Sequence, residues 1–181
     1  MACARSGVRY PRHVLIVDVL YQKMNLFERE SAGARAEGRE PLFFRRRTYR
    51  VSTSRFGIGQ VAGSNRTPLG LHRVAAKVGA GWPVGTVFRG RKAVGLTWGG
   101  LPDAPIAHRI LWLEGLEAGL NRGGDCDSHS RYIYVHGVGD EMTLGRPASC
   151  GCIHMAAKDL MPLFDFLSLG TLVWVAATGA R

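Results

Sequence analysis

The sequence has no long apolar run and no recognisable leader. None of its segments approaches the roughly 20 consecutive apolar residues that an α-helix needs to cross a bilayer, so a helical membrane span is excluded. The first residues, MACARSGVRYPRH, lack the apolar core of a secretory signal, so the sequence as given shows no export signal. No internal repeat is present either.

Cysteine is scarce. The four cysteines, Cys3, Cys126, Cys150 and Cys152, are too few to stabilise a fold of this length through disulfides. They also form no C-x-x-C pairs of the kind that hold structural zinc. At least one of them is therefore free for thiol chemistry.

The composition is that of a globular protein. Hydrophobic residues make up 46% of the 181 residues and charged residues 21%, which allows a sizeable core and argues against disorder. The length suits one domain, residues 1–181, with a core over about 13–177. The 24 glycines are spread along the chain, which favours many turns between short strands.

The chain is strongly basic. Its 24 Lys and Arg outnumber its 14 Asp and Glu, giving a formal net charge of +10. Such a surface attracts polyanions, including nucleic acid, anionic membrane and a carboxylate-rich cell wall. No nucleic-acid-binding motif accompanies the charge, so nucleic acid is not expected as a partner.

Most predicted elements are strands. Short runs rich in β-branched and aromatic residues predict strands over 13–19, 21–27, 42–52, 72–78, 108–113, 131–136 and 171–177. Residues 28–41 predict a long exposed connection, and 79–107 predict irregular structure with one or two short strands. Helical spacing predicts one helix within 156–167, with Pro162 near its first turn. The chain is therefore expected to be mainly β.

One segment gathers reactive side chains, HGVGDEMTLGRPASCGCIH over 136–154. His136 ends a predicted strand, and Cys152 precedes the predicted helix. A free thiol has a pKa of about 8.5 and needs a base, which a histidine within hydrogen-bond reach supplies. Gly151 lets the backbone approach a substrate and present N–H groups to an oxyanion.

Three other interpretations of this segment remain open from spacing alone. Cys152 can be a small buried hydrophobic residue, as free cysteines commonly are. Cys150, Cys152 and His154 alternate, so on a strand they would share a face and bind zinc with His136 or Cys126. A Cys150–Cys152 disulfide is a third possibility, although its small ring would be strained.

Between His13 and Val175 the chain resembles the L,D-transpeptidase (YkuD-type) catalytic domain. The resemblance rests on HVLIVDVLYQKMNLF, YRVSTSRFGIG, TPLG, RILWLEGLEAGLN, RYIYVHG and LGRPASCGCIHMAAKDLMPLFDFLSLGTLVWV, in this order. It implies a β-sandwich of mixed strands with one helix near the C-terminus. It also implies a peptidoglycan-directed enzyme that needs no metal or organic cofactor and that is inhibited by carbapenems.

The resemblance implies specific roles. Cys152 becomes the nucleophile and His136 the general base and acid, oriented by the backbone carbonyl of Gly137. The backbone N–H groups near Gly151 and Cys152 are the expected oxyanion donors.

Further side chains are expected to contact the substrate, and two positions depart from the family pattern. The expected contacts are Ser149, Tyr134 and His154. Cys150 stands where the family has histidine, and His154 stands where arginine commonly follows. The second change removes a guanidinium that could hold a carboxylate in a bidentate manner.

The implied reaction is acyl transfer in the cell wall. Cys152 would attack the carbonyl of the L-centre of the third residue of a stem tetrapeptide, commonly meso-diaminopimelate, and release D-alanine. An amine of another stem peptide would then form a 3→3 cross-link, whereas water would make the enzyme an L,D-carboxypeptidase. A weakened homologue that only binds peptidoglycan is the other alternative. The substrate implies the periplasm or cell wall, and the oligomeric state is open.

Overall fold

The computed structural model describes residues 11–30 and 41–177, which form a strand-rich fold. The strands and the α-helix are β1 (His13–Asp18), β2 (Lys23–Arg29), β3 (Phe43–Ser52), β4 (Gly70–Val78), β5 (Thr86–Arg89), β6 (Lys92–Leu96), β7 (Ala107–Gly115), β8 (Tyr134–Gly137), β9 (Ile153–Met155), α3 (Ala157–Phe166) and β10 (Leu172–Ala176). Short 3₁₀ turns are η1 (Thr97–Gly99), η2 (Gly124–Cys126) and η3 (Glu141–Thr143). In this part of the chain no helix is long and apolar enough to cross a membrane.

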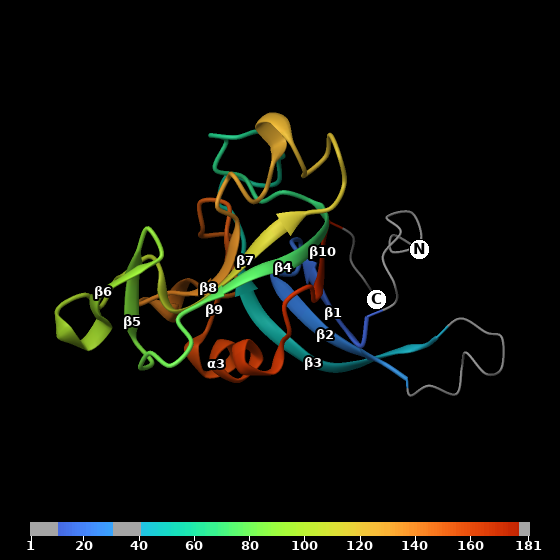
Figure 1. Cartoon of the computed structure of the whole chain (residues 1–181). Coiled ribbons are helices and arrows are strands. Elements are labelled where there is room, and N and C mark those ends of the chain that lie inside the picture. The colour runs from blue at the N-terminus through green and yellow to red at the C-terminus, as the bar shows by residue number, and fades with distance from the viewer. Residues whose placement is uncertain (1–10, 31–40, 178–181) are drawn as a thin grey trace.

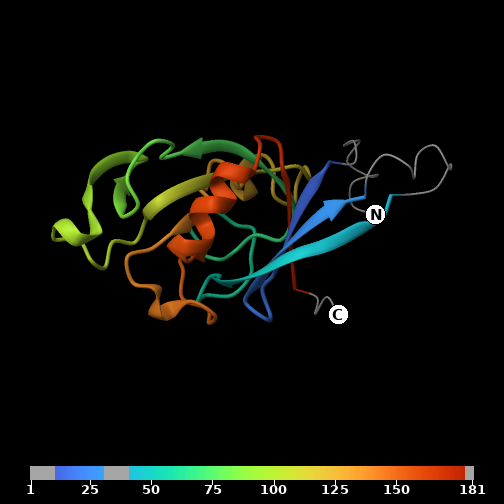
Figure 2. The ribbon, with the colours of Figure 1, turned by 90° about the horizontal axis from the view of Figure 1, so that it is seen from below.

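The strands form one mixed sheet that curls on itself. Their order is β4-β10-β1-β2-β3-β9-β8-β7-β5-β6, and β4 also pairs with β7, which closes the first eight of these strands into a ring. The β1–β10 and β8–β9 pairs are parallel, and the other pairs are antiparallel. The β5–β6 hairpin extends from the ring as a separate lobe (Figures 1 and 2).

The two faces of β7, β8 and β9 carry different residues, because successive side chains of a strand point to opposite faces. One face packs on α3, which lies against β7 and β8. The buried residues of these strands and of the helix that join one apolar cluster are Leu111, Leu113, Val135, Ile153, Met155, Leu160, Leu163 and Phe164. The opposite face carries Tyr134, His136, Cys152 and His154, and we call it the site face.

The sequence predicted the fold class correctly. The structure is mainly β, with mixed strands and one α-helix near the C-terminus. Two short strands, β5 and β6, occupy the segment 79–107 that we expected to be largely irregular. Residues 31–40 of the predicted exposed connection lie outside the described residues.

Three local predictions were wrong. The strand β9 was not predicted, because its three residues are too few to show a period. The strand expected from residue 131 begins at Tyr134, since Tyr132 has a left-handed φ of 57° that breaks the extended backbone. Pro162 lies in the second turn of α3 instead of the first, where it removes one helical hydrogen bond at an exposed position.

A buried histidine ties β4 to the loop before β8. His72 is fully buried, with Nδ1 3.0 Å from the Gly70 carbonyl and Nε2 2.9 Å from Ser128 Oγ. A carbonyl only accepts, so Nδ1 carries the proton and the Ser128 hydroxyl donates to Nε2. Burial lowers the pKa of His72 to about 4, and the ring is therefore neutral at pH 7.

This depressed pKa predicts acid sensitivity. Between pH 7 and 5.5 the unfolded chain protonates this histidine near its ordinary pKa of about 6.5, whereas the folded chain does not until about pH 4. Stability therefore falls as the pH drops, and we expect His72 to account for about 1 kcal/mol of the loss. Urea unfolding at the two pH values should show a smaller loss for His72→Asn, which keeps a donor for Gly70 but does not titrate. Equal losses in wild type and variant would contradict this assignment.

Candidate active site

The parallel pairing of β8 with β9 assembles the candidate site. Its register sets Val135 opposite Ile153, His136 opposite His154 and Gly137 opposite Met155. Cys152 immediately precedes β9 and so lies beside Tyr134, on the same face as the two histidines. Residues 16 positions apart in sequence are thereby brought together.

His136 is held as a neutral base in a buried position. It is 2% exposed, and its Nδ1 lies 2.8 Å from the carbonyl oxygen of Gly137. Nδ1 therefore carries the proton, which leaves the lone pair on Nε2. Burial lowers the pKa of His136 to about 3, and the neighbouring His154 adds to this shift.

His108 braces the backbone that follows His136. It has a left-handed φ of 70°, unusual for a residue with a side chain, at an irregularity in the pairing of β7 with β8. Its Nε2 lies 3.2 Å from the Val138 carbonyl, and its Nδ1 accepts from the Gly85 N–H at 2.7 Å. A Cβ at position 137 would collide with the His108 ring, so glycine is required there. The ring thus connects Gly85, just before β5, to the Val138 carbonyl, one residue after the Gly137 carbonyl that orients His136.

The Cys152 thiol is half-buried against aromatic residues. Its Sγ lies 3.4 Å from the Tyr132 carbonyl, to which the thiol donates, and the side chain packs against the cluster of Phe88, Ile110 and Tyr134. Burial raises the pKa of Cys152 to about 11, while nearby Arg131 acts in the opposite direction. Without a substrate, the thiol and the His136 imidazole are therefore both neutral at pH 7.

Side chains inside the protein fix the turn that presents Cys152. Gly151 has a φ of 117°, which favours glycine, and its carbonyl accepts from Thr67 Oγ1 at 3.1 Å. Ser149 is 1% exposed, and its hydroxyl donates to the Cys152 carbonyl at 2.6 Å and accepts from the Gly151 N–H at 3.2 Å. Ser149 was expected to contact substrate, but its hydroxyl is committed to this turn, which it supports.

The two positions that depart from the family pattern have contrasting surroundings. The His154 ring lies 4.9 Å from that of His136, between centroids, and its buried Nδ1 has no partner among the described residues. Burial lowers the pKa of His154 to about 4. Cys150 is exposed, and the Arg55 guanidinium lies 3.7 Å from its Sγ.

The structure does not support the zinc or disulfide interpretations. Across residues 11–30 and 41–177, no three His, Cys, Asp or Glu side chains are grouped so that they could hold a metal ion. Cys126, Cys150 and Cys152 are all free thiols, and Cys126 is buried in η2 with its thiol 3.1 Å from the Gly123 carbonyl. Cys3 lies outside the described residues.

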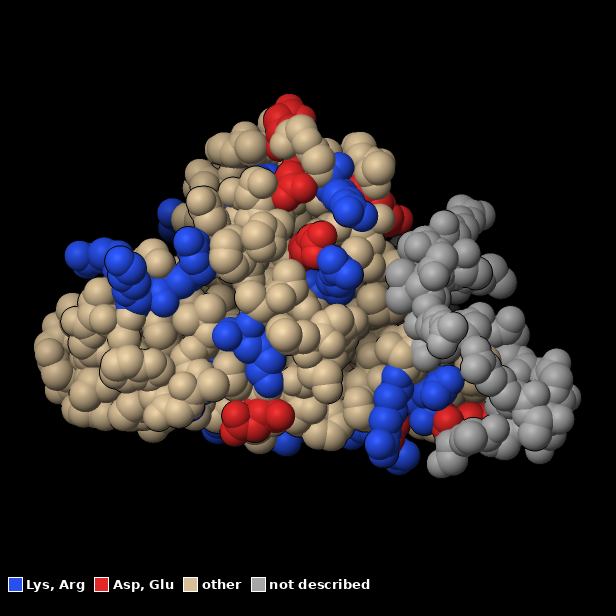
Figure 3. Space-filling model, viewed as in Figure 1, with Lys and Arg blue, Asp and Glu red and all other residues tan. Residues whose placement is uncertain are grey.

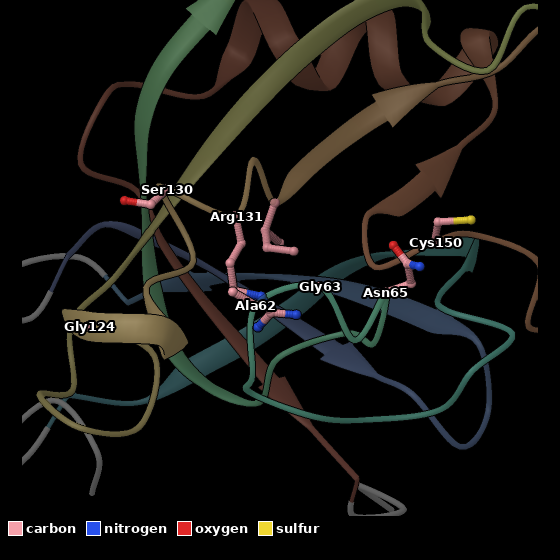
Figure 4. Close-up of a pocket in the computed structure, with 8 residues that line it drawn as sticks. Ala62, Gly63, Asn65, Gly124, Ser130, Arg131 and Cys150 are labelled. Atoms are coloured by element: carbon pink, nitrogen blue, oxygen red, sulfur yellow. The ribbon is translucent and has the colours of Figure 1, made fainter.

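A cavity of about 230 Å³ lies beside the turn that presents Cys152, residues 149–152, which we call the nucleophile turn after the role that the resemblance implies for Cys152. Its lining comes from three loops and comprises Ala62, Gly63, Asn65, Gly124, Ser130, Arg131, Ile133 and Cys150 (Figure 4). Arg131 holds the first loop by donating to the carbonyls of Gln60 and Arg66 at 2.7 Å each. The cavity therefore has a fixed wall on the Cys150 side of the turn.

An aromatic cluster lies beside Cys152, and sequence reasoning missed it. Trp112 stacks on His129 with ring centroids 4.0 Å apart, and Tyr134 meets Trp112 edge-on at 5.6 Å. The Arg91 guanidinium lies over Trp112, 4.5 Å from the ring centroid. Of these residues, only Tyr134 was predicted to belong to the site. The periodicity around Arg91 is too weak to have indicated its position.

Comparisons with known proteins found one family profile and several structures with a similar fold. The sequence profile of the YkuD family, the L,D-transpeptidase catalytic domain, matches residues 12–175. Bd1075 of Bdellovibrio bacteriovorus has a similar structure, with a TM-score of 0.57, 15% identity, and coverage of 93% of this chain and 49% of that protein. LdtMt1, an L,D-transpeptidase solved in complex with imipenem, has a TM-score of 0.50 and 14% identity. The match covers 91% of this chain and 59% of that protein.

An L,D-transpeptidase from Mycobacterium smegmatis gives a TM-score of 0.48 at 17% identity, with 92% of this chain and 59% of that protein covered. The chain thus spans about half to three fifths of the length of these structures. No curated protein sequence matches it. The structural likenesses concern the fold, whereas the profile match covers most of the chain. On that match, the chain belongs to the family of L,D-transpeptidase (YkuD) catalytic domains.

Proposed function

We propose that this protein is a peptidoglycan L,D-transpeptidase in which Cys152 is the nucleophile and His136 is the general base and acid. The observation that carries the proposal is the β8–β9 register, which sets Cys152 and His136 on one face of the sheet. The chain would act as a single catalytic domain on stem peptides in the periplasm or cell wall. Its family membership supports this substrate class.

Proton transfer begins at His136. The Gly137 carbonyl accepts the Nδ1 proton, so the Nε2 lone pair is available to take the proton of the Cys152 thiol. Because the resting thiol and imidazole are both neutral, deprotonation and attack on the substrate carbonyl occur together. The imidazolium formed then donates its proton to the departing amine of D-alanine.

The oxyanion of the tetrahedral intermediate needs donors near the nucleophile. The backbone N–H groups of Gly151 and Cys152 are the proposed donors. The Gly151 N–H now donates to Ser149 Oγ at 3.2 Å, a long bond that it would exchange for the oxyanion. Ser149 would thus keep this donor in place between reaction cycles.

A thioacyl-enzyme on Cys152 would then meet one of two acceptors. An amine of a second stem peptide gives a cross-link, and water gives the hydrolysed tripeptide of an L,D-carboxypeptidase. Neither outcome needs a metal or an organic cofactor.

A weakened, peptidoglycan-binding homologue is the second candidate, and Cys150 and His154 are the observation that favours it. His154 adds no positive charge at pH 7, because its pKa is lowered to about 4. The site therefore lacks the guanidinium that the family pattern has at this position.

Acylation tests the nucleophile directly. Under reducing conditions, a stem tetrapeptide should release D-alanine and leave an adduct on Cys152, seen by intact-mass spectrometry and peptide mapping. Cys152→Ala and His136→Ala should each abolish D-alanine release, because one lacks the nucleophile and the other lacks the base. Cys150→Ser is the matched thiol control and should keep the adduct. An adduct on Cys150, or no release while a related L,D-transpeptidase turns the peptide over, would refute the proposal.

The neutral resting pair predicts a steep pH profile. With a pKa of about 11, the thiolate is on the order of one molecule in ten thousand at pH 7. Alkylation of Cys152 by iodoacetamide, followed in the Cys150→Ser background, should accelerate about tenfold per pH unit between pH 7 and 9. A rate that is constant from pH 5 to 8 would instead indicate a thiolate–imidazolium pair.

The double change Cys150→His and His154→Arg separates the two candidates. An active enzyme should gain little D-alanine release, less than about threefold, because nucleophile and base are already present. A gain of a hundredfold or more would show that the natural chain is the weakened homologue. Circular dichroism would verify that the variant folds.

A further inference from the structure

Three guanidinium groups lie near the nucleophile turn, and their surroundings differ. Arg131 donates to the backbone carbonyls of Gly59, Gln60 and Arg66, which commits it to loop structure. Arg55 lies 3.7 Å from the thiol of Cys150. Arg91, at the turn between β5 and β6, lies instead beside the aromatic residues around Cys152.

Aromatic rings hold Arg91 in place. Its Cζ lies 4.5 Å from the Trp112 ring centroid and 5.1 Å from that of Tyr132. One N–H donates to Tyr134 Oη at 3.3 Å. A guanidinium held in this way has already lost much of the side-chain freedom that ligand binding would otherwise cost.

Two of the residues that hold Arg91, Tyr132 and Tyr134, also lie beside Cys152. The Tyr132 carbonyl accepts a hydrogen bond from the Cys152 thiol at 3.4 Å, and Tyr134 belongs to the buried cluster against which the Cys152 side chain packs. Arg91 is therefore one residue removed from the reacting sulfur, although it comes from a hairpin distant in sequence.

The charge of Arg91 is not neutralised by the protein. None of the carboxylates in the described residues lies within ion-pair distance of it. Between Lys77 and Asp103 the sequence contains Arg89, Arg91 and Lys92 and no acidic residue. Figure 3 shows Lys and Arg side chains along the upper edge of the lobe that holds β5 and β6, with no Asp or Glu on the visible part of that lobe. Such a field attracts anions.

We propose that Arg91, with Tyr134 Oη, forms a carboxylate-binding subsite near Cys152 that selects acyl donors carrying a free carboxylate on either residue of the scissile amide. The subsite rests on the proposed function, because it gives the Cys152 reaction its donor preference. Two carboxylates of a stem tetrapeptide qualify, that of the leaving D-alanine and that of the third-residue side chain. Arginine binds either through paired N–H···O bonds.

The test compares three donors, namely the tetrapeptide, its C-terminal amide and its third-residue amide. In wild type, the free-acid donor should acylate Cys152 about tenfold faster than the amide donor in which the bound carboxylate is removed. This ratio is expected for the loss of one charge-assisted hydrogen bond. Arg91→Gln should erase this preference by slowing the acid donor, while leaving that amide donor unchanged. Arg91→Lys should restore part of it, because lysine keeps the charge but not the paired geometry.

Arg89→Gln is the matched control, since Arg89 is an exposed arginine on the same hairpin, and it should keep the full preference. The amide donor that acylates wild type more slowly than the free acid identifies the carboxylate that Arg91 binds. Equal slowing of all donors by Arg91→Gln would mean that Arg91 only supports the aromatic cluster. No effect would also overturn the subsite.

Binding separates this proposal from the proposed function. Calorimetry with the unreactive Cys152→Ala protein should show about tenfold tighter binding of the acid peptide than of the discriminating amide, and Arg91→Gln should remove the difference. If wild type is never acylated but this difference appears, the enzyme proposal fails and the subsite stands. If acylation occurs without any dependence on Arg91, the subsite proposal fails and the enzyme proposal stands.

Discussion

The parallel pairing of β8 with β9 is the constraint on which the rest of the site depends. It involves only three residues from each strand, yet it fixes which side chains share the site face. A shift of one residue in this register would turn Cys152 and His154 toward the apolar cluster around α3. The neighbouring strands prevent such a shift, since β3 pairs with β9 and β7 pairs with β8 in the same sheet. The fold thereby places Cys152 and His136, which are 16 residues apart in sequence, on one face of the sheet.

Burial sets the chemistry of that pair. Removing the thiol and the imidazole from water stabilises their neutral forms, so the pKa of Cys152 is raised and that of His136 is lowered. A neutral imidazole is a competent base, but a neutral thiol is a poor nucleophile. In the proposed mechanism, reaction would therefore depend on a substrate that brings its carbonyl into place and excludes the remaining water. The arrangement favours a thiol that is unreactive until substrate occupies the site.

The sequence predicted the fold class and pointed to Cys152 and His136, because the order of the motifs carries that information. It could not predict the surroundings of these residues. The role of Ser149 as a support for the turn depends on burial. Arg91 comes from the β5–β6 hairpin, which joins the sheet where β5 pairs with β7 through one residue pair, and sequence periodicity does not reveal so short a pairing. His108 adopts a conformation that residues with side chains seldom take, and sequence periodicity does not reveal such a conformation.

The incomplete pairing of β3 affects the tendency of the protein to aggregate at high concentration. Along its length β3 pairs with β2, but on its other side β9 covers only Val51 and Ser52. Within residues 11–30 and 41–177, no strand pairs with the rest of β3 on that side, and a strand of another molecule could add to such an edge, the first step of sheet aggregation. This edge carries Arg45, Arg46, Arg47 and Arg50, all exposed. Arg46 is ion-paired with Glu28 and Arg47 with Asp159, so the repulsion between two such edges would come mainly from Arg45 and Arg50, and these charges disfavour self-association.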